Sequence, residues 1–312
     1  MARRYANLDS AHRPHDFGAI LRWGVLDRLT RRRRIEPAGP PAPSVPVDLE
    51  QIHAASPATR LTWIGHASFL GSLGGGRFLI DPVFSERAGW VVRRHVPAAL
   101  QASQLPSLDV LLITHSHYDH LDEPSVAALP RSVPVCVPRG LRRWFLRRGF
   151  RNVTELAWWE STACGALTIT LVPARHWSRR GIGDTNATLW GGYVIDDGHR
   201  RIYHCGDSAW FDGFDEIGRR FPGLLAAMLP VGSYSPTWFM EPHHLNPEQA
   251  CRAFHRLGAR HMVPMHWGTF KLTDEPLCEP VDRLRAWWME HAAGVDGELH
   301  VMSVGQTVVL DD

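Results

Sequence analysis

Three histidines and an aspartate lie within residues 114–120 (THSHYDH). Imidazole and carboxylate are ligands suited to zinc, iron or manganese. On an extended segment alternate side chains share a face, so His115 and His117 can bind one ion together. Asp119 and His120 fall in the turn that follows and can point at a second position. Four ligands at this spacing seldom belong to a loop that only caps a helix, so we expect a two-metal site.

Three later positions repeat one arrangement, in which a strand-like run ends at a residue that can bind a metal. His176 follows the run VPAR, Asp207 follows YHCG, and His266 follows VPM. A lone histidine at such a place is often a core residue, but the recurrence favours a shared site. A carboxylate can bridge two metals, and Asp207 is the natural candidate. The bridged ions would lie about 3.5–4 Å apart with a hydroxide between them, and they would lower the pKa of that water towards neutrality.

The segments that must position these residues are short strands and short helices. Apolar or alternating runs predict strands at residues 61–64, 67–73, 77–80, 110–114, 133–137, 167–172, 188–195, 201–204 and 225–229. Helical spacing of apolar residues predicts helices at residues 123–129, 141–148, 211–220, 247–257 and 281–291. Asn246 and Pro247 are typical of a helix cap and first turn. The pattern indicates a layered α/β or α+β fold with its chemistry on loops at strand ends.

The first 58 residues differ in character from the rest. Residues 16–33 predict an amphipathic helix capped by Asp16, with an arginine-rich face, and a proline-rich stretch at 37–46 predicts an extended linker. Residues 1–35 hold nine Arg and three Asp, a net +6, which leaves −4 for the remainder of a chain of net charge +2. We therefore expect a basic arm at 1–58 and a hydrolase domain at 59–312. The arm either meets an anionic surface or is simply solvated.

Length and composition limit the class of protein. The chain has 312 residues, 44% of them hydrophobic, which is enough for a large core. Its five cysteines include no C-x-x-C pair, so a reducing compartment is expected rather than a disulfide framework. The start lacks the apolar run of a signal peptide, and no run of 18 apolar residues occurs. The expected location is therefore the cytoplasm, with peripheral membrane contact through residues 16–34 as an open alternative.

The HxHxDH run, followed in order by His176, Asp207 and His266, resembles the metallo-β-lactamase superfamily over most of residues 60–310. That family folds as a four-layer αβ/βα sandwich, with a dinuclear site at one edge between the sheets. The resemblance implies two divalent metal ions, zinc first, with iron or manganese as alternatives. The ligand sets that it implies are His115, His117 and His176 for the first ion, Asp119, His120 and His266 for the second, and Asp207 as the bridge. True β-lactamases usually lack this aspartate bridge, which points to the phosphodiesterase and lactonase branches.

A narrower resemblance rests on five short segments. They are WIGHAS at 63–68, DPVFS at 81–85, PARHWS at 173–178, WFM at 238–240 and HWGTF at 266–270. Together they are similar to the N-acylphosphatidylethanolamine-hydrolysing phospholipase D family and its bacterial relatives. In that family a histidine just before Asp/Asn-Pro-Glu contacts the lipid product. His244, which precedes Asn246-Pro247-Glu248, is the matching position, with asparagine where aspartate is common.

Several residues beside the expected ligands have two interpretations. One of Arg175, Arg179 and Arg180 could bind a phosphodiester through its guanidinium, or all three lie in a solvated loop. His66 either lies near the metals or is a buried histidine bonded to backbone. Asp81 is expected to anchor a strand end and to support a ligand histidine as well. Four apolar side chains either line a groove for an acyl chain or belong to the core, namely Trp177, Trp238, Phe239 and Met240.

Three functions compete. The favoured one is a phosphodiesterase of phospholipase D type that uses a metal-bridging hydroxide, with Asp119, Asp207 and His244 as catalytic residues. The second keeps the metals but hydrolyses a lactone or β-lactam. The third is a non-catalytic adaptor for a membrane or nucleic acid, although no nucleic acid is expected because the body of the chain is acidic. The expected partners are a phosphodiester or lipid-like substrate and, as an open assembly state, a second copy in a homodimer.

Overall fold

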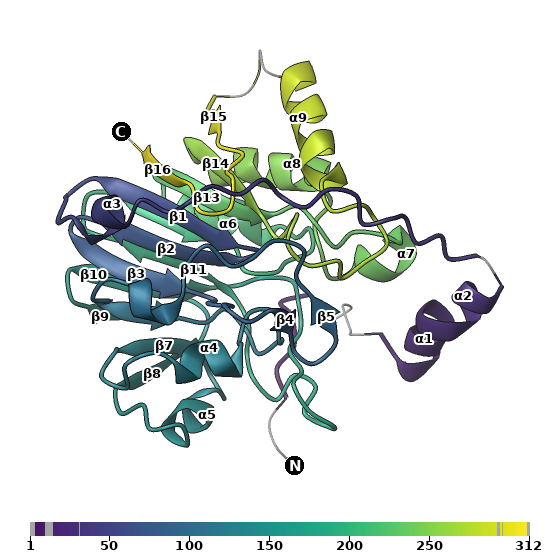
Figure 1. The fold of residues 1–312 in the computed structure, drawn as a ribbon, viewed down its shortest axis with the longest axis horizontal. Helices are drawn as coiled ribbons and strands as arrows, with labels where there is room; N and C mark the ends of the chain where they lie inside the picture. Colours follow the sequence, from purple (N-terminus) through teal and green to yellow (C-terminus); the bar gives the residue numbers. More distant parts are fainter. Residues whose placement is uncertain (1–3, 10–14, 31, 292–293, 295, 311–312) are drawn as a thin grey trace.

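The computed structural model describes residues 4–9, 15–30, 32–291, 294 and 296–310. Arg31 of the basic segment lies outside the described residues. Two seven-stranded sheets form the centre of the molecule (Figure 1). The first has the strand order β16-β1-β2-β3-β6-β7-β8, and the second has the order β15-β14-β13-β12-β11-β10-β9. In the described residues we find no helix with the length and apolar character needed to cross a bilayer.

The strands of the first sheet are β1 (Thr59–Gly65), β2 (Ser68–Leu73), β3 (Gly76–Ile80), β6 (Val110–Leu112), β7 (Val135–Pro138), β8 (Val153–Leu156) and β16 (Thr307–Leu310). Those of the second are β9 (Ser161–Cys164), β10 (Leu167–Val172), β11 (Gly192–Asp196), β12 (Arg201–His204), β13 (Leu224–Pro230), β14 (His261–Met265) and β15 (Glu298–Leu299). A separate hairpin pairs β4 (Arg87–Ala88) with β5 (Val92–Arg93). The central strands of each sheet pair in parallel, as β3-β6-β7-β8 and β12-β13-β14-β15, so their carboxyl ends share one edge.

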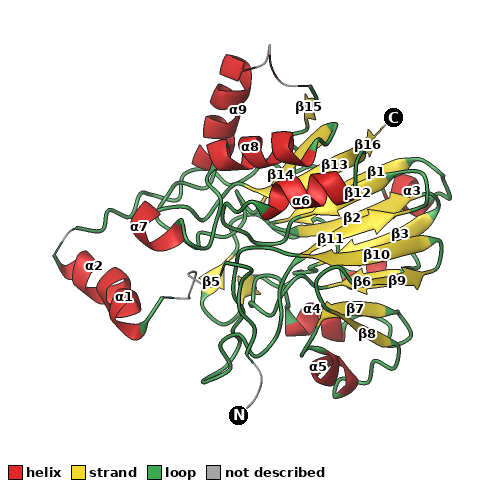
Figure 2. Cartoon of the chain, turned by 180° about the vertical axis from the view of Figure 1, so that it is seen from behind, coloured by secondary structure: helices red, strands yellow, loops and turns green. Residues whose placement is uncertain are grey.

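Helices cover the outer faces of both sheets, which completes four layers (Figure 2). Beside the first sheet lie α3 (Leu49–His53), α4 (Glu123–Ala127) and α5 (Arg142–Leu146). Beside the second lie α6 (Gly213–Arg220), α8 (Pro247–Leu257) and α9 (Glu279–His291). Three further short helices are η1 (Arg22–Leu26), η2 (Ala102–Gln104) and α7 (Thr237–Met240). The four-layer αβ/βα sandwich predicted from the sequence is confirmed.

The core fills the space between the two sheets. Trp63 and Phe78 from the first sheet and Tyr193 and Tyr203 from the second are fully buried in one cluster. A second cluster packs α4 and α5 against the outer face of the first sheet through side chains such as Phe145. All five cysteines are free thiols, which agrees with the prediction that no disulfide framework exists.

Local sequence signals explain where several helices and strands begin and end. The Asn246 side chain accepts a hydrogen bond from the Gln249 backbone, Pro247 occupies the first turn, and Gly258 ends α8 in the left-handed region. Other predicted segments are shorter in the structure. The strand expected from residue 188 begins only at Gly192, because the preceding backbone turns to bond other loops, as in the Gly191 N–H···O Thr114 bond of 3.1 Å.

The amino-terminal residues form the predicted helical run, which ends at Leu29 rather than at residue 33, and then the predicted extended one. The helical run comprises α1 (Phe17–Leu21), η1 and α2 (Asp27–Leu29), capped by Asp16, and it projects from one end of the sandwich (Figures 1 and 2). The proline-rich run is held on the body, because Ala42 N–H donates to Gly268 O at 2.9 Å and Val45 N–H donates to Val304 O at 2.8 Å. Ala42 is buried in the core. We propose the division into an arm at 1–58 and a domain at 59–312, with Ala42 and Val45 of the arm bonded to the domain.

Candidate metal centre

The predicted ligands meet at the edge where the central strands end. The segment with His115, His117, Asp119 and His120 follows β6. His176 follows β10, Asp207 follows β12 and His266 follows β14. Because these strands end at one edge of the sandwich, residues up to 151 positions apart in the chain reach a common point. All seven side chains lie in two clusters, and within each cluster the ligand atoms are within 4.8 Å of one another. A third group, Asp207, His244 and His266, links the two.

The first cluster consists of three imidazoles and one carboxylate. His117 Nδ1 lies 2.9 Å from His115 Nε2 and 3.2 Å from His176 Nε2. Asp207 Oδ2 lies 3.8 Å from His115 Nε2 and 3.7 Å from His176 Nε2. Three nitrogen atoms and one oxygen atom therefore face one point, as the ligands of a tetrahedral zinc ion do.

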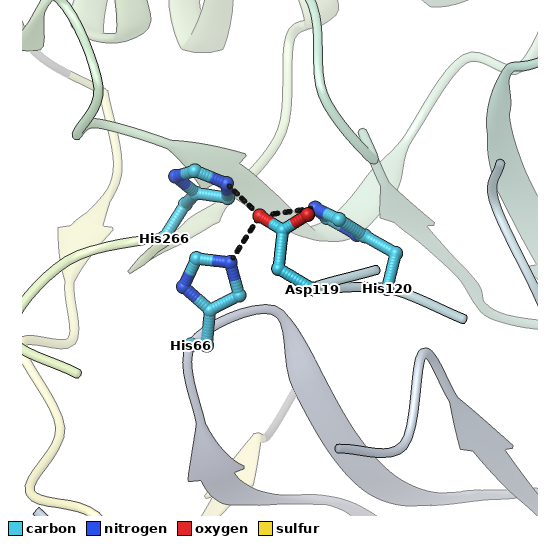
Figure 3. Close-up of side chains that lie close together, drawn as sticks. All are labelled: His66, Asp119, His120 and His266. Atoms are coloured by element: carbon cyan, nitrogen blue, oxygen red, sulfur yellow. Dashed lines mark hydrogen bonds and ion pairs between the residues drawn. The ribbon is translucent and has the colours of Figure 1, made fainter. Parts of the chain in front are cut away.

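The second cluster contains His66, Asp119, His120 and His266 (Figure 3). Asp119 Oδ2 lies 3.7 Å from His120 Nε2 and 3.5 Å from His266 Nε2. Asp207 also reaches this cluster, with Oδ2 at 3.3 Å from His120 Nε2 and Oδ1 at 3.3 Å from His266 Nε2. Asp207 is thus the carboxylate that lies between the two clusters.

Unsatisfied polar atoms indicate that these donors suit a cation. His120 Nε2, His266 Nε2 and Asp207 Oδ1 are buried and have no hydrogen-bond partner within the described part of the chain. A buried polar atom without a partner costs about 1–3 kcal/mol, and such atoms rarely gather in one place without a function. Divalent metal ions would satisfy all three, so the residues present fit a metal site.

Burial and charge divide the histidines into two groups. Burial lowers the pKa of His115 and His176 well below the usual value and that of His117 to about 4. At His266 burial also opposes the charge, but the Asp207 and Asp119 carboxylates outweigh it and raise the pKa to about 9. The pKa of His120 is raised well above its usual value, again against burial and through Asp207 first. Without metal, one side of the site holds neutral imidazoles and the other holds protonated ones.

Metal binding is therefore expected to release protons at neutral pH. A metal ligand must be an unprotonated imidazole, and metal-free His266 keeps its proton below about pH 9. Raising the pH towards 9 should thus strengthen binding, and lowering it should weaken binding. Calorimetric titration of zinc into metal-free protein, in buffers of different ionisation enthalpy at pH 7, measures the release. Heats that do not depend on the buffer would contradict the expectation.

Asp81 supports the ligands from behind. The fully buried carboxylate accepts hydrogen bonds from Thr114 N–H at 2.8 Å, from Thr114 Oγ1 at 2.6 Å and from His120 Nδ1 at 2.7 Å. Its backbone is in the left-handed region, with φ of 44°. Since Nδ1 of His120 donates to Asp81, Nε2 is left to face the cluster, which is the usual arrangement for a ligand histidine. The structure thus shows the predicted contact between Asp81 and His120, a candidate ligand.

His66 supports Asp119 in the same way. Its Nε2 lies 3.0 Å from Asp119 Oδ2 (Figure 3). Burial, and then the neighbouring His266, lower the pKa of His66 to about 3. The ring is therefore neutral, and its Nε2–H donates to the carboxylate. Of the two interpretations of His66, the one that places it near the expected ligands is confirmed.

Asn7 is a supporting residue that the sequence did not reveal. Its amide donates to His176 O at 2.8 Å and accepts from His176 N–H at 3.1 Å, and the side chain is buried. The ring of His176 is fixed separately, because Nδ1 donates to His243 O at 2.9 Å. The amino-terminal arm therefore holds a ligand that follows it by 169 residues, and no local pattern around Asn7 signals that contact.

A cavity of about 530 Å³ opens beside Asp119 and Asp207. Most of its wall is apolar, and it includes these side chains from six parts of the chain: Ile20, Trp23, Trp90, Val91, Val92, Tyr118, Trp177, Phe239, Met240 and Leu272. The amino-terminal helix was not expected here. Trp23 stacks on Phe239 with ring centroids 4.7 Å apart, which carries this helix over the cavity.

The structure brings some of the predicted substrate contacts together and places others elsewhere. His244, Trp177, Phe239 and Met240 line the cavity. Trp238 lies outside the described lining, where its ring packs under the Arg22 guanidinium at 4.4 Å. Arg175 also points elsewhere, because Nη1 donates to Trp210 O at 3.2 Å. Arg179, in the same loop, does reach the cavity.

His244 is the cavity residue next to the expected ligands. Its Nδ1 lies 3.9 Å from Asp207 Oδ2, and its ring centroid is 5.5 Å from that of His266. Burial lowers the pKa of His244 to about 4, so the ring is neutral near pH 7. A neutral imidazole both donates and accepts hydrogen bonds, so His244 can hold a polar group of a substrate against the cluster.

Two stacked sheets with helices on both sides, and a His/Asp cluster at the edge where parallel strands end, define a metal-dependent hydrolase of the metallo-β-lactamase fold. Comparison with known families agrees with this class. The family described as "Beta-lactamase superfamily domain" matches residues 76–267. The chain belongs to this superfamily.

Individual relatives narrow the group. The chain is 33% identical over 287 residues to the N-acyl-phosphatidylethanolamine-hydrolyzing phospholipase D 1 of Caenorhabditis elegans, covering 86% of this chain and 80% of that one. It is 32% identical over 226 residues to a metal-dependent hydrolase of Koribacter versatilis, covering 70% and 88%. A solved metallo hydrolase from Ignicoccus hospitalis superposes with a TM-score of 0.61 at 22% identity, covering 82% and 99%. This last likeness shows the fold alone.

Proposed function

We propose that the protein is a dinuclear phosphodiesterase of phospholipase D type that acts on N-acylphosphatidylethanolamine-like or related phosphodiesters. One observation carries the proposal. The apolar cavity opens directly on Asp119 and Asp207, so hydrocarbon can lie along the wall while a polar ester reaches the cluster. The name of the Caenorhabditis relative supports the same substrate class.

The proposed metal content is two divalent ions, zinc first and iron or manganese as alternatives. His115, His117 and His176 would hold one ion, and Asp119, His120 and His266 would hold the other. The support is that Asp207 lies within 3.8 Å of ligand nitrogen atoms in both clusters. When bound, such ions lower the pKa of a water molecule and offset the charge that develops on phosphoryl oxygens.

The protein's own side chains then orient the reacting groups. His66 donates to Asp119 and keeps its carboxylate turned towards the cluster. His244 is neutral and lies at the cavity wall, where it can hydrogen-bond the phosphodiester or an adjoining amide. Arg179 lines the same cavity and supplies a positive charge for a phosphate. The roles of Asp119, Asp207 and His244 as catalytic residues are part of this proposal.

A comparison of substrates tests the function. Zinc-loaded protein is assayed with bis-p-nitrophenyl phosphate, an N-acylated phosphatidylethanolamine and an acyl-homoserine lactone. The proposal expects turnover of both phosphodiesters that stops on chelation, and slower turnover of the lactone. A preference for the lactone would replace it with the lactonase function, because both reactions would use the same ligands. Absence of turnover of all three substrates would overturn both hydrolases and favour an adaptor.

Leu272 gives a way to separate hydrocarbon binding from chemistry. Its half-buried side chain lines the cavity. The Leu272→Trp variant is expected to narrow the wall and to raise KM for a long-chain N-acyl phospholipid. Overpacking costs about 1–3 kcal/mol, which corresponds to a roughly 5- to 150-fold rise. The rate with bis-p-nitrophenyl phosphate, which has no chain, should not change.

The control for this experiment is Leu146→Trp on α5, where the leucine is 39% exposed and is not part of the cavity wall. Equal loss of activity on both substrates in Leu272→Trp would contradict an acyl chain in this cavity. So would an unchanged KM for the lipid.

Exposed apolar residues lie on the amino-terminal helix and at Trp90 in the cavity wall, and we propose that they rest on a membrane. On the amino-terminal helix Leu26 is 50% exposed and Leu29 is 77% exposed, while Trp90 beside the cavity is 87% exposed. Arg28, Arg32 and Arg34 lie near the helical residues in sequence, which adds attraction to anionic lipid. Such a surface would let a lipid pass from the bilayer into the cavity while the protein stays peripheral.

The double variant Leu26→Glu/Leu29→Glu is expected to lose partition into anionic vesicles. Burial of each leucine in lipid contributes about 1.5–3 kcal/mol, so partition should fall by well over tenfold. Sedimentation with phosphatidylserine-containing vesicles measures it, and Leu146→Glu is the matched control. The bis-p-nitrophenyl phosphate rate should not change in either variant. Unchanged vesicle binding would indicate that the arm is only solvated.

A further inference from the structure

A second group of metal-binding side chains lies at the opposite end of β14 from His266. His261 is the first residue of β14, Glu298 is the first residue of β15, and His300 follows β15. In the parallel pair formed by these strands, His261 and Glu298 are direct register partners. The strand rises about 3.3 Å per residue, so His261 is on the order of 16 Å from His266 along it. This group is therefore separate from the candidate metal centre.

The three ligand atoms form a compact triangle. His261 Nδ1 lies 3.0 Å from His300 Nε2 and 3.7 Å from Glu298 Oε2, and His300 Nε2 lies 3.6 Å from the same oxygen. A point about 2.0 Å from all three atoms exists for a triangle with these sides. Zinc bonds histidine nitrogen at about 2.0–2.1 Å and carboxylate oxygen at about 2.0–2.2 Å.

A simple hydrogen bond between the two rings explains only part of this geometry. It accounts for the 3.0 Å between His261 and His300. The carboxylate lies 3.6–3.7 Å from both nitrogen atoms, which is too long for hydrogen bonds but suits two ligands of one ion. Histidine nitrogen atoms lie at similar distances in the candidate metal centre. His117 Nδ1 is 2.9 Å from His115 Nε2 and 3.2 Å from His176 Nε2.

The surroundings leave room for further ligands. The three side chains open into a hollow of about 700 Å³ that Asp296, Arg260 and His255 also line. His261 is buried and Glu298 is exposed, so an ion here would have protein on one side and solvent on the other. Three protein ligands with an open position are typical of sites that also bind water or a small anion.

We propose that His261, Glu298 and His300 form a further binding site for a divalent transition-metal ion, with water or a small anionic ligand completing its coordination. Two imidazoles and one carboxylate suit zinc, nickel, cobalt or copper rather than magnesium or calcium. The ion would join residues 298–300 to the start of β14, next to the two-residue strand pair that already connects these segments. The site does not depend on the proposed phosphodiesterase activity.

Counting zinc in the loaded protein tests the proposal. Wild type and the His261→Ala/His300→Ala variant are dialysed to equilibrium against the same series of buffered zinc concentrations, and metal per chain is measured by mass spectrometry. The expected result is one ion fewer per chain in the variant at saturating zinc, with the bis-p-nitrophenyl phosphate rate unchanged. His199→Ala, which removes an exposed histidine from a turn, should bind as wild type does. Equal zinc in all three proteins would overturn the site and leave a hydrogen-bonded histidine pair.

A second variant keeps the test valid if the double variant fails to fold. The Glu298 side chain is 70% exposed, so Glu298→Gln is expected to fold normally. It should need more free zinc to fill the additional site, while the ions of the main centre stay in place. Copper bound at the additional site offers a spectroscopic check, because its electron paramagnetic resonance should show two nitrogen ligands in wild type and one in His300→Ala. Zinc binding by Glu298→Gln that matches wild type, or copper spectra without a change at His300→Ala, would contradict the assignment.

Discussion

Replacement of Asp207 with alanine is expected to lower hydrolytic activity by more than about a hundredfold and to lower the metal content of the protein. Removing a residue that only supports a ligand already costs about 10–100-fold, and Asp207 faces both clusters directly. Asp207 also lies within 3.8 Å of four ligand histidines, and it is the main negative charge that raises the pKa of His120 and His266, so its loss weakens the counter-charge of these two buried imidazoles. Metal per chain and turnover of bis-p-nitrophenyl phosphate are the two measurements.

The matched control is Asp212→Ala, which removes an exposed carboxylate at the start of α6, five residues along the chain. It should retain both activity and metal. If Asp207→Ala kept two ions per chain, the bridge would be disproved even if activity fell. If it kept one ion and partial activity, a single occupied cluster would be sufficient for hydrolysis.

The Asp81→Asn variant is expected to bind metal about 10–100-fold more weakly, although Asp81 is not itself in either cluster. An asparagine has one oxygen to accept hydrogen bonds, whereas the carboxylate accepts them from the Thr114 backbone, the Thr114 hydroxyl and His120. With the amide in place, His120 loses the partner that directs its Nε2 towards the cluster. The side chain is fully buried, so water cannot replace that partner.

Competition against a chelator measures this affinity, and kcat at saturating zinc shows whether the chemistry survives. Asp109→Asn is the control. The Asp109 carboxylate also accepts a hydrogen bond from a backbone N–H, that of Arg77, but it lies in the segment before β6. We expect kcat of Asp81→Asn to recover largely at high zinc. A wild-type affinity would show that the ligand loop holds its shape without Asp81.

The cluster of candidate ligands was predictable because its geometry is mostly local. Four ligands lie within residues 114–120, directly after a buried strand, and alternation along an extended segment is a property of the backbone itself. His176, Asp207 and His266 could be added because each follows a strand, and the ends of parallel strands meet at one edge. The fold class followed from the same mixture of short apolar runs and helical patterns.

The walls of the cavity were only partly predictable. Trp177, Phe239 and Met240 lie there as proposed, while Trp238, next in sequence to Phe239, packs under Arg22 instead. Neighbours on a short helix such as α7 point in different directions, and which of them meets the cavity depends on what packs against the helix. The amino-terminal helix reaches this place through Trp23 and through the Arg33–Asp274 ion pair of 2.6 Å, two contacts between distant parts of the chain.

Sequence alone thus settled which residues could bind metal and roughly where strands would carry them, since ligand chemistry and strand periodicity are properties of a few adjacent residues. The tertiary structure decided how those residues are supported and what surrounds them. Asn7 on His176, His66 on Asp119 and the group of His261 with His300 all join positions that have no relation along the chain. Such contacts exist only once the two sheets have packed, because packing sets the distance between side chains that the backbone does not connect.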